Sequence, residues 1–118
     1  MAVTRAVAGE RAEALAAEFL AAQGMTILER NFRRRCGEID LVARDGDTLV
    51  FVEVRLRTRG DFGGAAASIT AKKRARIAAA AGLYLARLRR TPPCRFDAVL
   101  LDAIDPDRIE WMKDFMGA

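Results

Sequence analysis

Two acidic residues on adjacent predicted strands, Asp40 and Glu53, form the pair in this chain best suited to bind a divalent cation. The segments 37–42 and 51–55 have strand-like apolar patterns and are separated by a turn around Gly46-Asp47. If these two turn residues form the loop of a hairpin, the numbers of paired residues sum to 93, and Asp40 lies opposite Glu53. Two carboxylates that face each other on a sheet repel unless something lies between them, and a divalent cation would meet that need.

The length of the loop decides whether the two carboxylates share a face. A four-residue loop over 45–48 keeps the same pairing, whereas a three-residue loop would place Glu53 on the opposite face of the sheet. A polar rim on an ordinary pair of strands is the alternative interpretation of both acids. Arg55 follows Glu53 on the same face, where a cation could orient a nucleophile or stabilise charge that develops on a phosphate.

Composition narrows the chemistry that is available. The chain has 118 residues, 52% of them apolar and 31% charged, which is typical of one globular domain over 1–118. It contains no histidine, which excludes serine–histidine nucleophile pairs and histidine-based zinc sites. Carboxylate oxygens favour hard cations such as Mg²⁺ or Mn²⁺. The net charge of +4 suits a polyanionic partner.

Localisation follows from what the sequence lacks. The most apolar stretch, residues 75–86, is interrupted by Arg76, and we expect no membrane-spanning segment. The N-terminal residues have no apolar export signal, and Cys36 and Cys94 lack the spacing of a CxxC site. These features predict a cytoplasmic protein with reduced thiols.

Periodicity predicts helices near 4–23 and 70–88, with Ser68 or Thr70 capping the second, and strands near 25–32, 38–44, 48–56, 95–104 and 108–112. We expect a turn at 33–35 and a loop at 57–67. The strand 48–56 is apolar on both faces, which predicts a mixed sheet of about five strands between helices. Ile39 and Leu41 are predicted to share one face of that sheet with Val52.

Several motifs resemble the YraN-type bacterial family, which is similar to archaeal Holliday-junction resolvases and belongs with the restriction-endonuclease-like nucleases. The resemblance covers roughly residues 8–102. It rests on Gly9-Glu10, Arg30-Asn31-x-Arg33, Gly37-Glu38-Ile39-Asp40-Leu41, Phe51-Val52-Glu53-Val54-Arg55-x-Arg57, Phe62-Gly63, Lys73 before Ile77, and Arg95-Phe96-Asp97. It implies a restriction-endonuclease-like α/β/α sandwich.

For function, the resemblance implies a metal-dependent endonuclease acting on DNA, including branched or structured DNA. It makes Asp40 and Glu53 metal ligands, offers the carbonyl of Val54 as another, and matches Glu10 to an acidic residue that completes the metal site. A solvated charge near a helix start is the alternative for Glu10. Glu38 is assigned to the surroundings of the site. The resemblance also allows a homodimer, because resolvase-like relatives work as dimers.

One residue departs from the superfamily's pattern, in which Glu-x-Lys is typical and this chain has Arg55. Arginine stays protonated, so it can stabilise charge but cannot act as a general base. The rival hypothesis is therefore a nucleic-acid-binding protein that keeps the fold without catalysis. A less favoured hypothesis is an assembly factor that binds another acidic partner.

Clusters of basic residues flank the acidic pair in the predicted arrangement. Phosphate contacts from such residues give affinity without sequence specificity. The candidates for nucleic-acid contact are Arg33, Arg34, Arg57, Lys72, Lys73 and Arg76. Each cluster could instead be an ordinary solvated face, and the arginines at 87, 89 and 90 also suit the dipole at the end of a helix.

Overall fold

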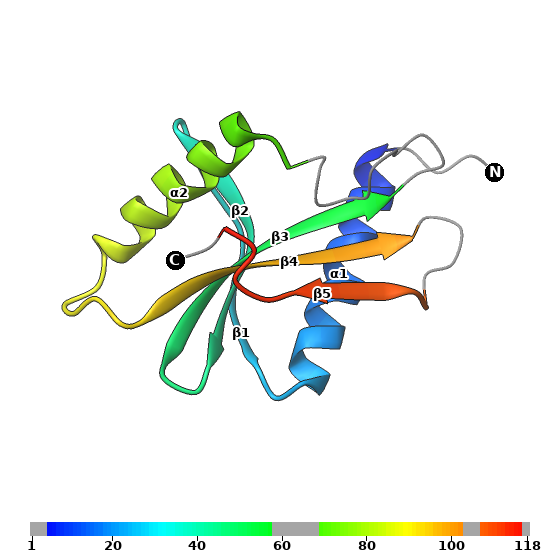
Figure 1. The fold of residues 1–118 in the computed structure, drawn as a ribbon, viewed down its shortest axis with the longest axis horizontal. Helices are drawn as coiled ribbons and strands as arrows, with labels where there is room; N and C mark the ends of the chain where they lie inside the picture. Colours follow the sequence, from blue (N-terminus) through cyan, green and yellow to red (C-terminus); the bar gives the residue numbers. More distant parts are fainter. Residues whose placement is uncertain (1–4, 58–68, 103–106, 117–118) are drawn as a thin grey trace.

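Five strands form one sheet with a helix on each face in the computed structural model, which describes residues 5–57, 69–102 and 107–116 (Figure 1). The elements are α1 (Arg5–Ala22), β1 (Thr26–Arg34), β2 (Gly37–Asp45), β3 (Thr48–Arg57), α2 (Ala71–Leu85), β4 (Cys94–Asp102) and β5 (Ile109–Met112). The strands lie in chain order, and only β3 and β4, which α2 connects, are parallel. The predicted α/β fold with a mixed sheet is confirmed.

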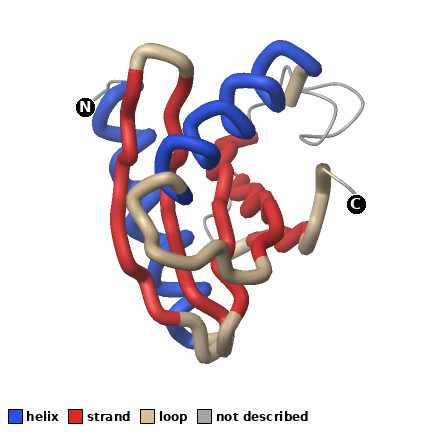
Figure 2. The backbone as a smooth tube through the Cα atoms, turned by 90° about the vertical axis from the view of Figure 1, so that its left-hand side faces the viewer, coloured by secondary structure: helices blue, strands red, loops and turns tan. Residues whose placement is uncertain are grey.

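The two helices cover opposite faces of the sheet (Figure 2). Small residues of α1, such as Ala16, let that helix pack closely on Leu41 and Val52. Ile77, Ala81 and Tyr84 of α2 pack on the other face, against Phe51. Burial on both sides explains why β3 has apolar residues at successive positions. Among the described helices, none is long and apolar enough to cross a membrane.

The hairpin of β2 and β3 has the predicted register. The paired residues run from Asp45 with Thr48 to Leu41 with Val52, and the residue numbers of every pair sum to 93. Gly46, the first loop residue, has a φ of 60°, as a type II′ turn requires. The pairing ends one step before Asp40 and Glu53, because β2 continues along β1 while β3 continues along β4. Figure 1 shows the two strands separating beyond this point.

The hairpin of β1 and β2 has an unusual backbone angle at the same level. Asn31, which lies across from Asp40 between two regular pairs, has a φ of 54°. Asparagine tolerates this left-handed conformation better than most residues. Ile39 packs with the α2 cluster while Leu41 packs with the α1 cluster, so the prediction that they share a face is wrong. The positive φ of Asn31 lies at the level where this change of face occurs.

Gly37, at the start of β2, lets α2 approach the sheet with no side chain between the two backbones. A Cβ atom at this position would collide with the backbone of Arg76. Thr70 caps α2 as predicted, its hydroxyl accepting a hydrogen bond from the amide of Lys73 at 3.2 Å. Most boundaries lie within one residue of the prediction, but α2 ends earlier, at Leu85, and β1 continues to Arg34, so Arg33 and Arg34 belong to the strand and not to the turn.

Candidate functional site

Asp40 connects the two strands at the point where they separate. Its Oδ2 atom accepts a hydrogen bond from the backbone amide of Val54 at 2.8 Å. The carboxylate thus replaces the backbone partner that Val54 would have had if the β2–β3 ladder continued. Since the N–H and C=O of one strand residue point to the same side, the carbonyl of Val54 faces the same opening.

The environment of Asp40 disfavours its negative charge. Burial, and after it the nearby charge of Glu53, raise the pKa of this carboxyl from its ordinary value of 3.8 to about 8. The Val54 amide opposes this rise in the pKa, while the charges of Glu13 and Glu38 add to it. At neutral pH the carboxyl of Asp40 therefore holds a proton that a bound cation would replace.

Glu53 is the more deeply buried member of the pair, with 5% of its surface exposed. Burial raises its pKa, and the charges of Lys73 and Arg55 counteract that rise. The ammonium of Lys73 lies 3.3 Å from Oε1 of Glu53 and is itself 37% exposed. Helix α2 therefore contributes a cation to a site whose acids come from the sheet. From the sequence, Lys73 was predicted as a nucleic-acid contact and belonged to the family resemblance, with no partner on the sheet assigned to it.

The donor set suits a small hard cation. Two carboxylates from neighbouring strands, with water in the remaining positions, are the kind of site that Mg²⁺ uses in proteins. Within the described ranges no three acidic, cysteine or histidine residues gather closely enough to hold an ion together. Glu10 is exposed and is not brought to the pair. The acid of α1 whose charge reaches Asp40 is Glu13, almost one turn further along the helix.

The predicted nucleic-acid contacts differ in what they already touch. Arg33 forms an ion pair with Glu38 at 3.4 Å, and the guanidinium of Arg34 lies 4.1 Å from the ring centre of Phe32. Lys72 and Arg76 are exposed on the first turns of α2. Arg57 ends β3, and its side chain lies outside the part of the structure that is described.

A second acidic centre, at Asp97 of β4, was noted in the sequence only as part of the family resemblance. Asp97 is fully buried and accepts hydrogen bonds from Arg95 at 3.1 Å, from the Trp111 indole at 3.0 Å and from the Asp114 amide at 2.9 Å. Trp111 packs edge-on against Phe19 of α1, so this centre lies on the face opposite to α2. These contacts attach β5 and the segment after it to the sheet, which is a structural role.

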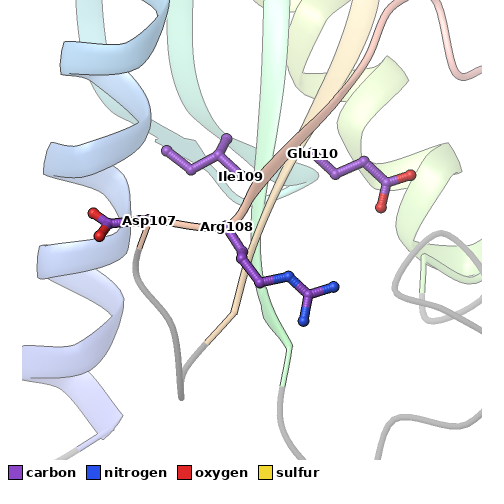
Figure 3. Close-up of a pocket in the computed structure, with 4 residues that line it drawn as sticks. All are labelled: Asp107, Arg108, Ile109 and Glu110. Atoms are coloured by element: carbon purple, nitrogen blue, oxygen red, sulfur yellow. The ribbon is translucent and has the colours of Figure 1, made fainter.

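A pocket beside β5 is lined by Asp107, Arg108, Ile109 and Glu110. Their side chains diverge: Asp107 points towards α1, whereas Arg108 and Glu110 point away from it (Figure 3). Arg108 is also paired with Asp102 at 3.5 Å. All four lining residues come from one consecutive segment, and their polar groups do not converge on a common point. The pocket therefore does not compete with the acidic pair as a candidate site.

Comparison with known proteins identifies the family. The model of the uncharacterised protein family UPF0102 matches residues 12–101. Similar proteins include a UPF0102 protein of Methylobacillus flagellatus, 52% identical over 93% of this chain and 96% of its own length. Others are UPF0102 proteins of Nitrosomonas europaea, 53% identical over 90% of each chain, and of Dechloromonas aromatica, 52% identical over 98% of this chain and 92% of its own. Their names state no activity, and this chain belongs to the UPF0102 family.

Proposed function

We propose that this protein is a Mg²⁺- or Mn²⁺-dependent endonuclease that hydrolyses phosphodiester bonds in DNA. The observation that supports this most is the acidic pair, Asp40 and Glu53, buried together where two strands separate. Burying two neighbouring acids is unfavourable, and apolar residues of similar size would often be more stable. A function that needs both acids explains why this chain has them.

In this mechanism the carboxylates of Asp40 and Glu53 would hold the ion, and the carbonyl of Val54 is a further candidate ligand. A bound ion would supply neutralisation of the phosphate charge and a lower pKa for the attacking water. The sheet holds both carboxylates on paired backbone, which limits their movement. Arg55, whose charge already acts on Glu53, would stabilise the phosphate as a permanent cation.

The substrate preference within this proposal comes from two sources. Exposed basic residues such as Lys72 and Arg76 surround the start of α2 and would bind the DNA backbone irrespective of sequence. The resemblance to Holliday-junction resolvases favours branched DNA as the substrate. Arg55, in place of the superfamily's lysine, favours a second candidate function, DNA binding without cleavage.

The experiment is a cleavage assay on linear, flapped and four-way DNA with Mg²⁺ or Mn²⁺. Asp40→Asn should lower the cleavage rate by about a thousandfold or more, because the ion loses a charged ligand. DNA binding without metal should persist at neutral pH, where the carboxyl of Asp40 is protonated, and should strengthen above pH 8, where the change removes one negative charge near the phosphates. Asp47→Asn, the same change in the exposed turn of this hairpin, is the matched control and should cleave normally. A wild-type protein that binds every DNA and cleaves none would establish the second candidate instead.

Arg55 variants then test the departure from the superfamily's pattern. Arg55→Lys should cleave as fast as the wild type or faster, because the cation is kept. Arg55→Ala should be slower, because the charge next to the phosphate is lost. Should Arg55→Lys cleave where the wild type does not, the arginine is the residue that prevents catalysis.

A further inference from the structure

Lys73 connects the helix layer to the acidic pair, and its position has a consequence for cation binding. Its ammonium lies 3.3 Å from Oε1 of Glu53, a carboxylate that is 95% buried on the sheet face covered by α2. Thr70 caps the first turn of α2 through the amide of Lys73, so the backbone that carries this ammonium is fixed. The side chain itself is partly exposed and has room to move.

An ammonium next to a buried carboxylate competes with a divalent ion for that carboxylate. The two cations repel each other, and this repulsion is weakly screened at a site that is largely buried. An ion bound to Glu53 would therefore displace the ammonium. The displaced ammonium would then lie near the exposed side chains of Lys72 and Arg76, on the first two turns of α2. A phosphate that binds to these basic side chains would be its best remaining partner.

We propose that Lys73 is the built-in counter-cation of Glu53, which a divalent ion displaces and which then binds the DNA phosphate at the site. This inference rests on the proposed function. It adds to the site a residue, Lys73, that lies on a helix and not on a strand. It explains how Glu53 is oriented before an ion arrives, because the ammonium of Lys73 lies beside its carboxylate. It also gives α2 a direct part in substrate binding, since its first turn carries the exchanged cation.

The test is calorimetric titration of the DNA-free protein with Mn²⁺ at pH 9, comparing wild type, Lys73→Met and Lys72→Met. Lys73→Met should bind Mn²⁺ more tightly, on the order of tenfold, because the competing charge is gone. Lys72→Met removes an equal charge from the adjacent residue of the same turn and should change the affinity by less than about twofold. Lys73→Arg keeps the charge and should bind as the wild type does.

DNA binding in EDTA gives a second readout that distinguishes a counter-cation from an ordinary phosphate contact. Without an ion, Lys73 is held by Glu53, so Lys73→Met should lose less DNA affinity than Lys72→Met. Unchanged or weaker Mn²⁺ binding by a folded Lys73→Met protein would overturn the inference while leaving the nuclease proposal standing. Tighter binding by Lys73→Met in a protein that cleaves no DNA would leave the inference standing and overturn the nuclease proposal. A wild type that binds no divalent ion overturns both.

Discussion

Two acidic centres lie on opposite faces of one sheet, and they are stabilised in contrasting ways. Asp97 is fully buried, but a guanidinium, an indole and an amide donate to its carboxylate. At Asp40 and Glu53, two carboxyl groups lie side by side; the amide of Val54 donates to Asp40 and the ammonium of Lys73 lies beside Glu53. The first centre, in which three donors surround one acid, is complete by itself, whereas the second, in which two acids are neighbours, would gain from an added cation. Burial of an acid alone therefore does not distinguish the two centres; the second acid does.

Each of the two centres also contains one residue with an unusual backbone angle. The two described residues other than glycine with positive φ are Asn31 and Asp114, one at each centre. Asp114 uses this conformation to point its amide at Asp97, which accepts a hydrogen bond from it. Asn31 lies across from Asp40, beside the point where β2 and β3 separate. At Asp97 the residue with positive φ thus supplies a hydrogen bond to the acid, whereas at Asp40 it lies beside the point where the strands separate.

The largest effect on stability should come from the centre that is complete. Asp97→Asn replaces a carboxylate with an amide whose NH₂ group faces donors, and it leaves the Arg95 charge without its buried partner. We expect a loss of about 3–5 kcal/mol in the free energy of unfolding, measured by urea denaturation. Asp47→Asn, in the exposed turn, should stay within about 0.5 kcal/mol. If Asp97→Asn is as stable as Asp47→Asn, the hydrogen bonds to Asp97 contribute nothing measurable to stability, and the contrast between the two centres is lost.

At the incomplete centre, removing an acid should have the opposite effect on stability: Asp40→Asn should raise the free energy of unfolding at high pH. Asp40 has a folded-state pKa of about 8 against an ordinary 3.8, so between these values the folded protein holds a proton that the unfolded chain releases. The free energy of unfolding should therefore fall as the pH rises through this window. Asp40→Asn does not titrate, so its stability should be flatter and should exceed that of the wild type above pH 8.

Urea denaturation at pH 5, 7 and 9 checks this expectation. Adding Mg²⁺ or Mn²⁺ at pH 9 should restore stability to the wild type but not to Asp40→Asn, because the ion binds only the folded wild-type pair. Parallel pH dependences of wild type and variant would mean that Asp40 does not carry the raised pKa.

A smaller effect should follow from removing one donor of Asp97 and leaving the others. Trp111→Phe keeps an aromatic ring against Phe19 and deletes the indole N–H that donates to the carboxylate at 3.0 Å. We expect a loss of about 1.5–3 kcal/mol, typical of one hydrogen bond to a charged group. Thermal or urea unfolding measures it. A cost as large as that of Asp97→Asn would show that packing of the indole matters more than its hydrogen bond.

The smallest effect concerns the exposed basic residues next to the incomplete centre. Replacing Lys72 and Arg76 together with alanine should reduce the slope of log affinity for DNA against log salt by about 2, because two phosphate contacts and their released counterions are lost. Arg44→Gln, on the opposite end of β2, serves as the control and should leave the slope unchanged. An unaltered slope in the double variant would remove the start of α2 from the docking surface.

Local sequence rules were sufficient to predict the β2–β3 hairpin and the relative positions of its two acids. Gly46 determines the turn, the turn determines the register, and the register places Asp40 and Glu53 as neighbours. The two apolar faces of β3 likewise predicted helices on both sides. Each of these inferences needed only residues close together in the sequence.

The features that could not be predicted depend on how distant elements pack. Lys73 reaches Glu53 because of the way α2 lies on the sheet, which its own sequence does not specify. Choosing between Glu10 and Glu13 required the rotational phase of α1, and the face of Ile39 changes at the level of an unusual φ angle in the neighbouring strand. The donors to Asp97 come from the far end of the chain.

The close approach at Gly37 has a consequence for the evolution of this site. Arg76, whose backbone rests on Gly37, is three residues from Lys73, about 4.5 Å along the helix axis. The spacing between the ammonium of Lys73 and the sheet is therefore set by contact of two main chains, with no side chain acting as a spacer. Charged residues on the surrounding surface can change over generations without altering that spacing, whereas a single added methyl group on β2 would alter it.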